Sequence, residues 1–200
     1  MKKKILYTCI LLTMLLTLSA CGTTAAGSAE PAASSRSTGA APEVLPPTAE
    51  ELGRDASTTL IMTLEGMEEK VPATLYVGQT GDGGYSLYIP SEGWTNTQDD
   101  CWSPDVNTDV SLEIRFDGGM TAEQASAELT RSGSGYELYG FTEQEPGIYR
   151  GHDKEQSLTV QLRLAEASDG TYEIWQIYPD EAAEGFGARL GFLADTFQVN

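Results

Sequence analysis

Histidine and cysteine are scarce in this chain of 200 residues, which contains one histidine and three cysteines. A single histidine excludes a metal site built from several imidazoles, and any serine or cysteine triad would depend on His152 alone. His152 lies in the polar run Gly151-His152-Asp153-Lys154, and no Gly-x-Ser-x-Gly motif accompanies it. We therefore interpret His152 as a residue of a solvated turn and predict that the protein is not an enzyme.

Basic residues are also few, since 12 Lys and Arg stand against 30 Asp and Glu for a formal net charge of −18. Residues 1–20 contain three lysines and no acid, so their removal would leave 9 basic residues and a charge of −21. Nucleic acids and anionic lipid headgroups are bound through clustered basic side chains. The composition therefore predicts no nucleic-acid partner and no membrane binding through a basic surface.

The long apolar run of the chain lies at its N-terminus, from Ile5 to Leu18, and three lysines precede it. A basic start, an apolar core and small residues before a cut are typical of a signal peptide. The tetrapeptide Leu18-Ser19-Ala20-Cys21 resembles the lipobox of bacterial lipoproteins. The resemblance implies cleavage before Cys21, attachment of a diacylglyceryl group with palmitate-type chains to Cys21, and a domain on the extracytoplasmic face of the cell membrane. An ordinary secretory signal with an accidental cysteine is the alternative.

Residues 21–57 change character, because Gly, Ala, Ser, Thr and Pro dominate and large apolar side chains are almost absent. Such a segment cannot bury enough apolar surface to fold, so we predict a flexible linker with one helical turn near Pro47 to Leu52. The rest of the chain, 58–200, is predicted to form a single domain. Within it Cys101 has no intrachain partner, and we interpret it as a small buried apolar residue.

Alternation of apolar and polar residues predicts strands over most of this domain. The strands are expected at 60–64, 71–77, 85–89, 110–116, 148–150, 158–164 and 172–178. A capping box at Thr121 and Gln124 predicts a mid-chain helix that Gly133 stops, and Asp180 is expected to cap a C-terminal helix that runs to Phe197. We predict an α+β fold: one mainly antiparallel sheet covered by two helices.

The run Gly84-Tyr85-Ser86-Leu87-Tyr88-Ile89-Pro90, followed by Gly93-Trp94, the mid-chain helix and the closing helix, is similar to the PsbP-like fold. The likeness spans roughly residues 80–199. The overall layout also resembles small tethered lipoproteins of Gram-positive bacteria. These resemblances imply a non-catalytic extracytoplasmic module without a cofactor, and they assign no functional residue.

One acidic cluster has the ligand alternation of a calcium loop, in Asp105-x-Asn107-x-Asp109. However, Val110 stands where the loop needs glycine, and Phe116 stands where it needs a bidentate glutamate. We interpret the cluster as a polar connection between strands, with weak calcium binding as the alternative.

Aromatic residues are the other candidates for function, because there are more than a small core requires. Trp94, Trp102, Tyr88 and Trp175 are the predicted partner-binding residues, and burial of these rings under the helices is the competing explanation. The preferred function is a lipid-anchored module that binds a protein, peptide or cell-wall component. The alternatives are a calcium-binding module and an extracytoplasmic hydrolase that uses a metal or carboxylates, which predicts a pocket holding two acids of raised pKa.

Overall fold

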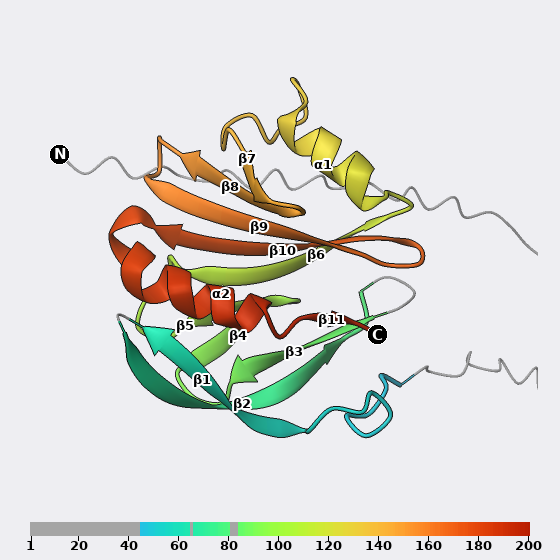
Figure 1. The fold of residues 1–200 in the computed structure, drawn as a ribbon, viewed down its shortest axis with the longest axis vertical. Helices are drawn as coiled ribbons and strands as arrows, with labels where there is room; N and C mark the ends of the chain where they lie inside the picture. Colours follow the sequence, from blue (N-terminus) through green and yellow to red (C-terminus); the bar gives the residue numbers. More distant parts are fainter. Residues whose placement is uncertain (1–44, 65, 81–83) are drawn as a thin grey trace, which may run out of the picture. The chain divides into compact units, whose positions relative to one another are not determined.

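The computed structural model describes residues 45–64, 66–80 and 84–200, and strands account for 49% and helices for 16% of these residues. The strands form two antiparallel sheets (Figure 1). The prediction of an α+β fold with one sheet and two helices is therefore wrong, because the domain is rich in β-structure. Three segments outside the predicted strands also pair as strands, at Trp94–Gln98, Cys101–Pro104 and Thr142–Glu145.

The small sheet has four strands, and the predicted hairpin forms one side of it. Its strands are β1 (Ser57–Leu64), β2 (Met67–Gly78), β3 (Tyr85–Pro90) and β11 (Gln198–Val199), in the spatial order β1-β2-β3-β11. Met62 faces the core and is 1% exposed, whereas its neighbour Ile61 is 57% exposed. This alternation follows from the period of two along a strand with one buried face.

The large sheet has seven strands. In spatial order they are β4 (Trp94–Gln98), β5 (Cys101–Pro104), β6 (Ser111–Gly118), β10 (Gly170–Pro179), β9 (Leu158–Glu166), β8 (Ile148–Asp153) and β7 (Thr142–Glu145). The predicted hairpin of β9 and β10 is confirmed. The edge strand β7 pairs with β8 only at Ile148 to Arg150, so β8 continues past the end of its neighbour.

Two hydrophobic clusters lie on opposite faces of the large sheet. The first fills the space between the sheets and includes Leu87, Leu112, Tyr172, Ile174, Leu190 and Leu193. The second lies beneath helix α1 (Ala122–Thr130) and includes Leu129, Phe141, Tyr149, Leu162 and Trp175. The central strand β10 contributes to both, so both of its faces are covered, which explains why nearly all of its residues are buried.

The capping box predicted at the start of α1 is present. The Thr121 hydroxyl accepts a hydrogen bond from Gln124 N at 3.2 Å, and the Gln124 side chain accepts one from Thr121 N at 2.9 Å. These bonds satisfy backbone donors that the first turn leaves without partners.

The C-terminal helix is shorter and less regular than predicted. It begins with a 3-10 turn at Asp180–Ala182, continues as one turn of π-helix at Ala183–Gly187, and becomes helix α2 only at Ala188–Ala194. Gly185 and Gly187 weaken regular helix in this stretch, because glycine costs about 1 kcal/mol relative to alanine. Asp180 does not cap it, since its carboxylate binds Thr159 and His152 instead.

The described part of the predicted linker contacts the domain. Residues Thr48 to Arg54 form the expected turn, and Leu52 N donates to Thr48 O at 3.1 Å. The Arg54 guanidinium donates to Ser86 Oγ at 2.8 Å and to Thr196 O at 2.9 Å, which joins β3 to the end of the chain. The predicted signal peptide, the lipobox and Cys21 lie outside the described residues.

Candidate functional site

The four aromatic candidates do not share one surface. Trp102 and Trp175 are only 4% and 1% exposed, so their rings are core residues. The Trp102 ring meets Tyr76 edge to face at 4.7 Å between centroids, and Trp175 packs among the rings beneath α1. Alternation along their strands could not reveal this burial, because both faces of the large sheet are covered.

Tyr88 and Trp94 are partly buried, and each already has partners. The Arg54 guanidinium lies 4.6 Å from the centre of the Tyr88 ring, and the Tyr88 hydroxyl donates to Asp55 O at 2.9 Å. Trp94 packs against the cluster between the sheets. These contacts give each ring a structural role in its own region of the domain.

The residues of the calcium-like cluster form hydrogen bonds that stabilise the connection between β5 and β6. Asp105 Oδ1 accepts a hydrogen bond from the Thr95 hydroxyl at 2.7 Å, and Asn107 Oδ1 accepts one from Asp109 N at 3.1 Å. Across the described residues, no three or more His, Cys, Asp and Glu side chains gather in a way that could hold a metal ion.

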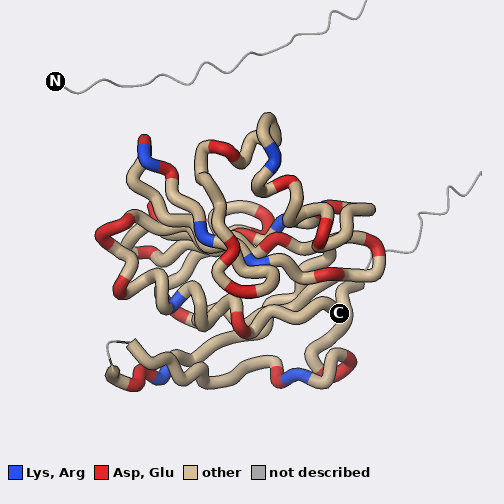
Figure 2. Tube along the Cα trace, turned by 45° about the horizontal axis from the view of Figure 1, so that its top comes forward, with Lys and Arg blue, Asp and Glu red and all other residues tan. Residues whose placement is uncertain are grey.

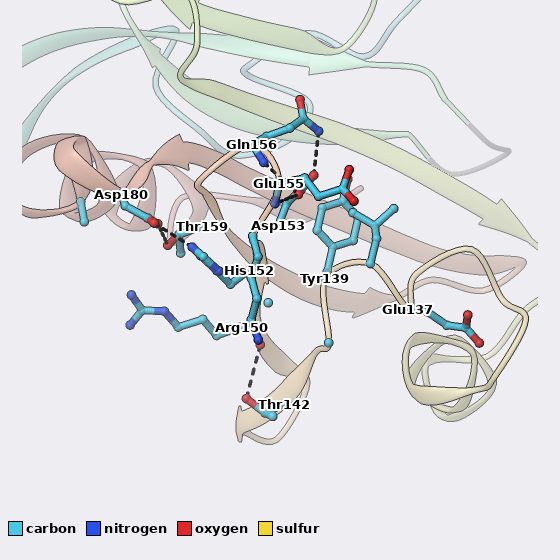
Figure 3. Close-up of a pocket in the computed structure, with 15 residues that line it drawn as sticks. Glu137, Tyr139, Thr142, Arg150, His152, Asp153, Glu155, Gln156, Thr159 and Asp180 are labelled. Carbon is cyan, nitrogen blue, oxygen red and sulfur yellow. Dashed lines mark hydrogen bonds and ion pairs between the residues drawn. The ribbon is translucent and has the colours of Figure 1, made fainter.

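A groove of about 1040 Å³ lies at the β7 edge of the large sheet, where β8 extends beyond β7 (Figure 3). Most of its lining residues come from the loop before β7, strand β8 and the turn into β9, and Thr142 of β7, Thr159 of β9, Asp180 and Ala183 complete it. Its acidic and basic residues are Glu137, Arg150, His152, Asp153, Lys154, Glu155 and Asp180. The groove is therefore the largest concentration of ionisable side chains around a described cavity.

His152 belongs to strand β8 and not to a solvated turn. Its Nε2 lies 2.7 Å from Asp180 Oδ2, and the other carboxylate oxygen of Asp180 accepts a hydrogen bond from the Thr159 hydroxyl at 2.8 Å. These two bonds, to His152 first and to Thr159 second, lower the pKa of Asp180. Figure 3 shows Arg150 and His152 on the same side of β8, with Tyr139 on the other.

Three of the four carboxylates in the groove are already satisfied by the protein. Asp180 has the two partners just described. Asp153 accepts from the side chain of Gln156 at 2.7 Å and from two backbone N–H groups of the turn, and Glu137 accepts from Gly133 N. The Gln156 bond lowers the pKa of Asp153 most strongly, and the Gly133 bond lowers that of Glu137. These acids therefore remain ionised to low pH, and each already accepts at least one hydrogen bond from the protein.

Arg150 and Lys154, the arginine and the lysine of the groove, lack such partners among the described residues. Arg54, Arg115, Arg131, Arg163 and Arg189 each donate a side-chain hydrogen bond, four of them to a carboxylate. Among the described arginines, Arg150 alone has a guanidinium with no hydrogen bond or ion pair, and Lys154 forms no ion pair either. Figure 2 shows how few and scattered the basic positions are among the acidic ones, which makes an unpaired arginine unexpected.

Arg150 acts on the neighbouring acid Asp180 through its charge. The positive charge of Arg150 contributes to the low pKa of Asp180, whereas the hydrogen bonds to that carboxylate come from His152 and Thr159. Sequence reasoning missed Arg150, because the pairing of an arginine depends on tertiary contacts. The available signal was the alternation of Arg150, His152 and Lys154, which places three cationic side chains on one face if β8 is extended through this stretch.

The groove lacks the feature that the hydrolase alternative predicted. Glu173 is the one carboxyl among the described residues whose pKa is raised, by burial, and it lies on the α1 face of the large sheet at 2% exposure. Its carboxylate accepts hydrogen bonds from Trp175 Nε1 at 2.8 Å and from the Tyr136 hydroxyl at 3.4 Å. Glu173 is therefore a buried group without access to the groove.

Comparison with known proteins identifies no relative: no protein-family model matches the chain, and no curated protein matches it. None of the helices in the described part of the chain combines the length and the apolar character needed to span a membrane.

Proposed function

We propose that the protein is a lipid-anchored extracytoplasmic binding module, that Cys21 carries the lipid, and that the groove beside β8 is the ligand-binding site. The N-terminal sequence supports the anchor. The unpaired guanidinium of Arg150 supports the site, because it offers five donors in a fixed geometry and none of the described residues accepts a hydrogen bond from it.

The state of the acids favours binding over acid–base catalysis. A general acid needs a pKa raised towards the working pH, whereas the pKa values of Glu137, Asp153 and Asp180 are lowered. A groove with ionised, internally bonded carboxylates and free cationic donors is suited to holding a ligand in one orientation.

Photo-crosslinking in the producing cells tests the site. A photoreactive amino acid replaces Leu138, which lines the groove and is 55% exposed, and a matched protein carries it at Val106, which is 84% exposed in the connection between β5 and β6. We expect a discrete adduct from position 138 and none from position 106. Equal crosslinking from the two positions, or none from either, would contradict the groove as the site.

The anchor is tested separately by mass spectrometry of the protein from membranes. We expect an N-terminal peptide that begins at Cys21 and carries a diacylglyceryl group. A Cys21→Ala protein should be released from the membrane fraction, and its retention would contradict the anchor.

A further inference from the structure

We propose that the ligand of the groove is a short peptide with a free C-terminal carboxylate, and that the guanidinium of Arg150 binds this carboxylate through two parallel hydrogen bonds. This inference rests on the proposed function and names the ligand class for the same site. A planar carboxylate matches the fork of an arginine, and the protein itself supplies no carboxylate oxygen to Arg150.

The balance of charge in the groove favours a ligand with one negative charge over a polyanion. Asp153, Asp180 and Glu137 are occupied but remain negative, and Glu155 adds a fourth carboxylate. A chain of phosphates would bring several negative charges past these four groups, whereas a single terminal carboxylate brings one to the side of β8 that carries Arg150. His152, held in place by Asp180, lies on that same side and is a second polar contact for the ligand.

The size and the walls of the groove favour a peptide over a small acid. A volume of about 1040 Å³ is at the upper end for small-ligand clefts, which span about 300 to 1,000 Å³. Leu138 and Tyr139 line the groove, and Tyr139 lies on the other side of β8 from Arg150, so a ligand that contacts both sides must be longer than a small acid.

The test uses the full chain, immobilised in detergent, and two pools of random tetrapeptides that differ only in having a free or an amidated C-terminus. The retained peptides are quantified by mass spectrometry. We expect the free-acid pool to be enriched about tenfold to a hundredfold over the amide pool, as the loss of a charged hydrogen-bond pair implies.

Two variants assign this preference to Arg150. In Arg150→Gln the preference should disappear, and because the guanidinium forms no hydrogen bond or ion pair with the described residues, the melting temperature should change little. The control Arg131→Gln removes the same charge from the exposed pair with Glu128 and should retain the full preference. An Arg150→Lys protein should keep only part of it, since a lysine cannot form the two parallel bonds.

Three results would overturn the inference: equal retention of the two pools, an unchanged preference in Arg150→Gln, or displacement of the peptides by inorganic phosphate at the same concentration. The proposed function fails by a different result. If the crosslink at position 138 is found in cells while the peptide pools show no preference, the groove is a binding site for another ligand and only the ligand class is wrong.

Discussion

The carboxylate of Asp100 accepts a hydrogen bond from the hydroxyl of Tyr85, a fully buried residue of the core between the sheets. The same oxygen accepts from the Tyr76 hydroxyl at 3.2 Å, and the other oxygen accepts from Thr80. Asp100 lies in the turn between β4 and β5 of the large sheet, whereas Tyr76 and Tyr85 belong to the small sheet. One turn residue therefore connects the two sheets.

Replacement of Asp100 by alanine should lower the free energy of unfolding by about 2–4 kcal/mol. The change leaves the Tyr85 hydroxyl buried without its acceptor, and it places alanine at a φ of 57°, in the left-handed region. Urea denaturation measures the effect. Asp100→Asn is the matched control, because asparagine tolerates this backbone conformation and keeps one acceptor oxygen. It should therefore lower the free energy of unfolding clearly less than Asp100→Ala does. Equal stability of wild type and Asp100→Ala would contradict the role of Asp100.

The same contact predicts a spectroscopic result. Burial and the bond to Asp100 raise the pKa of Tyr85, and burial together with the charge of Asp100 raises that of Tyr76 to about 12. Absorbance titration of the folded protein should show that these two phenols ionise only above the range of ordinary tyrosines, near pH 10. In Asp100→Asn the Tyr76 transition should move towards lower pH. An unchanged titration curve in that variant would show that the carboxylate does not control these phenols.

Glu173 predicts that one substitution stabilises the protein. Burial raises the pKa of Glu173 in the folded state above its unfolded value of 4.5, so the ionised form opposes folding at neutral pH. This cost disappears as the pH falls through the folded pKa. Glu173→Gln should therefore raise the stability at pH 7 by about 1 kcal/mol, or about 2–4 °C, and should have little effect below pH 4.

Thermal melting of Glu173→Gln at several pH values measures whether the substitution stabilises the protein at neutral pH. Glutamine keeps an acceptor for Trp175 Nε1, which limits the structural change. Glu113→Gln on the same face is the comparison, since it only removes the ion pair with Arg115 and should be neutral or slightly destabilising. We expect the melting temperature of Glu173→Gln to exceed that of wild type at pH 7 by more than it does at pH 4. The opposite order would contradict the argument.

Gly151 allows the loop before β7 to approach strand β8. A Cβ at this position would lie 2.8 Å from Phe141 and 2.9 Å from the Tyr139 side chain, which is closer than packed atoms can be. Gly151→Ala should cost about 1–3 kcal/mol and should also reduce crosslinking from position 138, because the wall of the groove moves. Gly185→Ala is the control: the nearest atom would be Arg189 Nη1 at 3.8 Å, so alanine should be neutral or stabilising.

The strands and α1 were predictable because their signals are local. The alternation of Leu112, Ile114 and Phe116 fixes the face of β6, and the residues of the capping box are three positions apart. The division into two sheets was not predictable, since it depends on distant pairings such as Tyr85 with Val199, for which no short-range pattern exists. The same limit applies to β4, β5 and β7, which are short and carry polar residues that are typical of loops.

The candidate site shows the same difference between local signals, which the sequence contains, and tertiary contacts, which it does not. The aromatic residues were visible in the sequence, but whether a ring lies in the core depends on what covers the other face of its sheet, as for Trp175 under α1. The alternation of Arg150 with His152 and Lys154 indicates a shared face, but it does not show that Arg150, unlike the other described arginines, forms no hydrogen bond or ion pair. An unpaired cation is a property of the complete set of contacts and only the fold reveals it.

Arg54 predicts where the folded domain begins. The sequence placed the boundary after residue 57, but the Arg54 guanidinium donates to Ser86 O at 3.1 Å, to Ser86 Oγ at 2.8 Å and to Thr196 O at 2.9 Å. Arg54→Ala should therefore reduce the stability by about 1–3 kcal/mol in urea denaturation, because it removes these bonds and the contact with the Tyr88 ring. Arg131→Ala, which removes an exposed pair with Glu128, should cost clearly less stability than Arg54→Ala. If the two variants lose the same stability, Arg54 belongs to the linker and the boundary after residue 57 is correct.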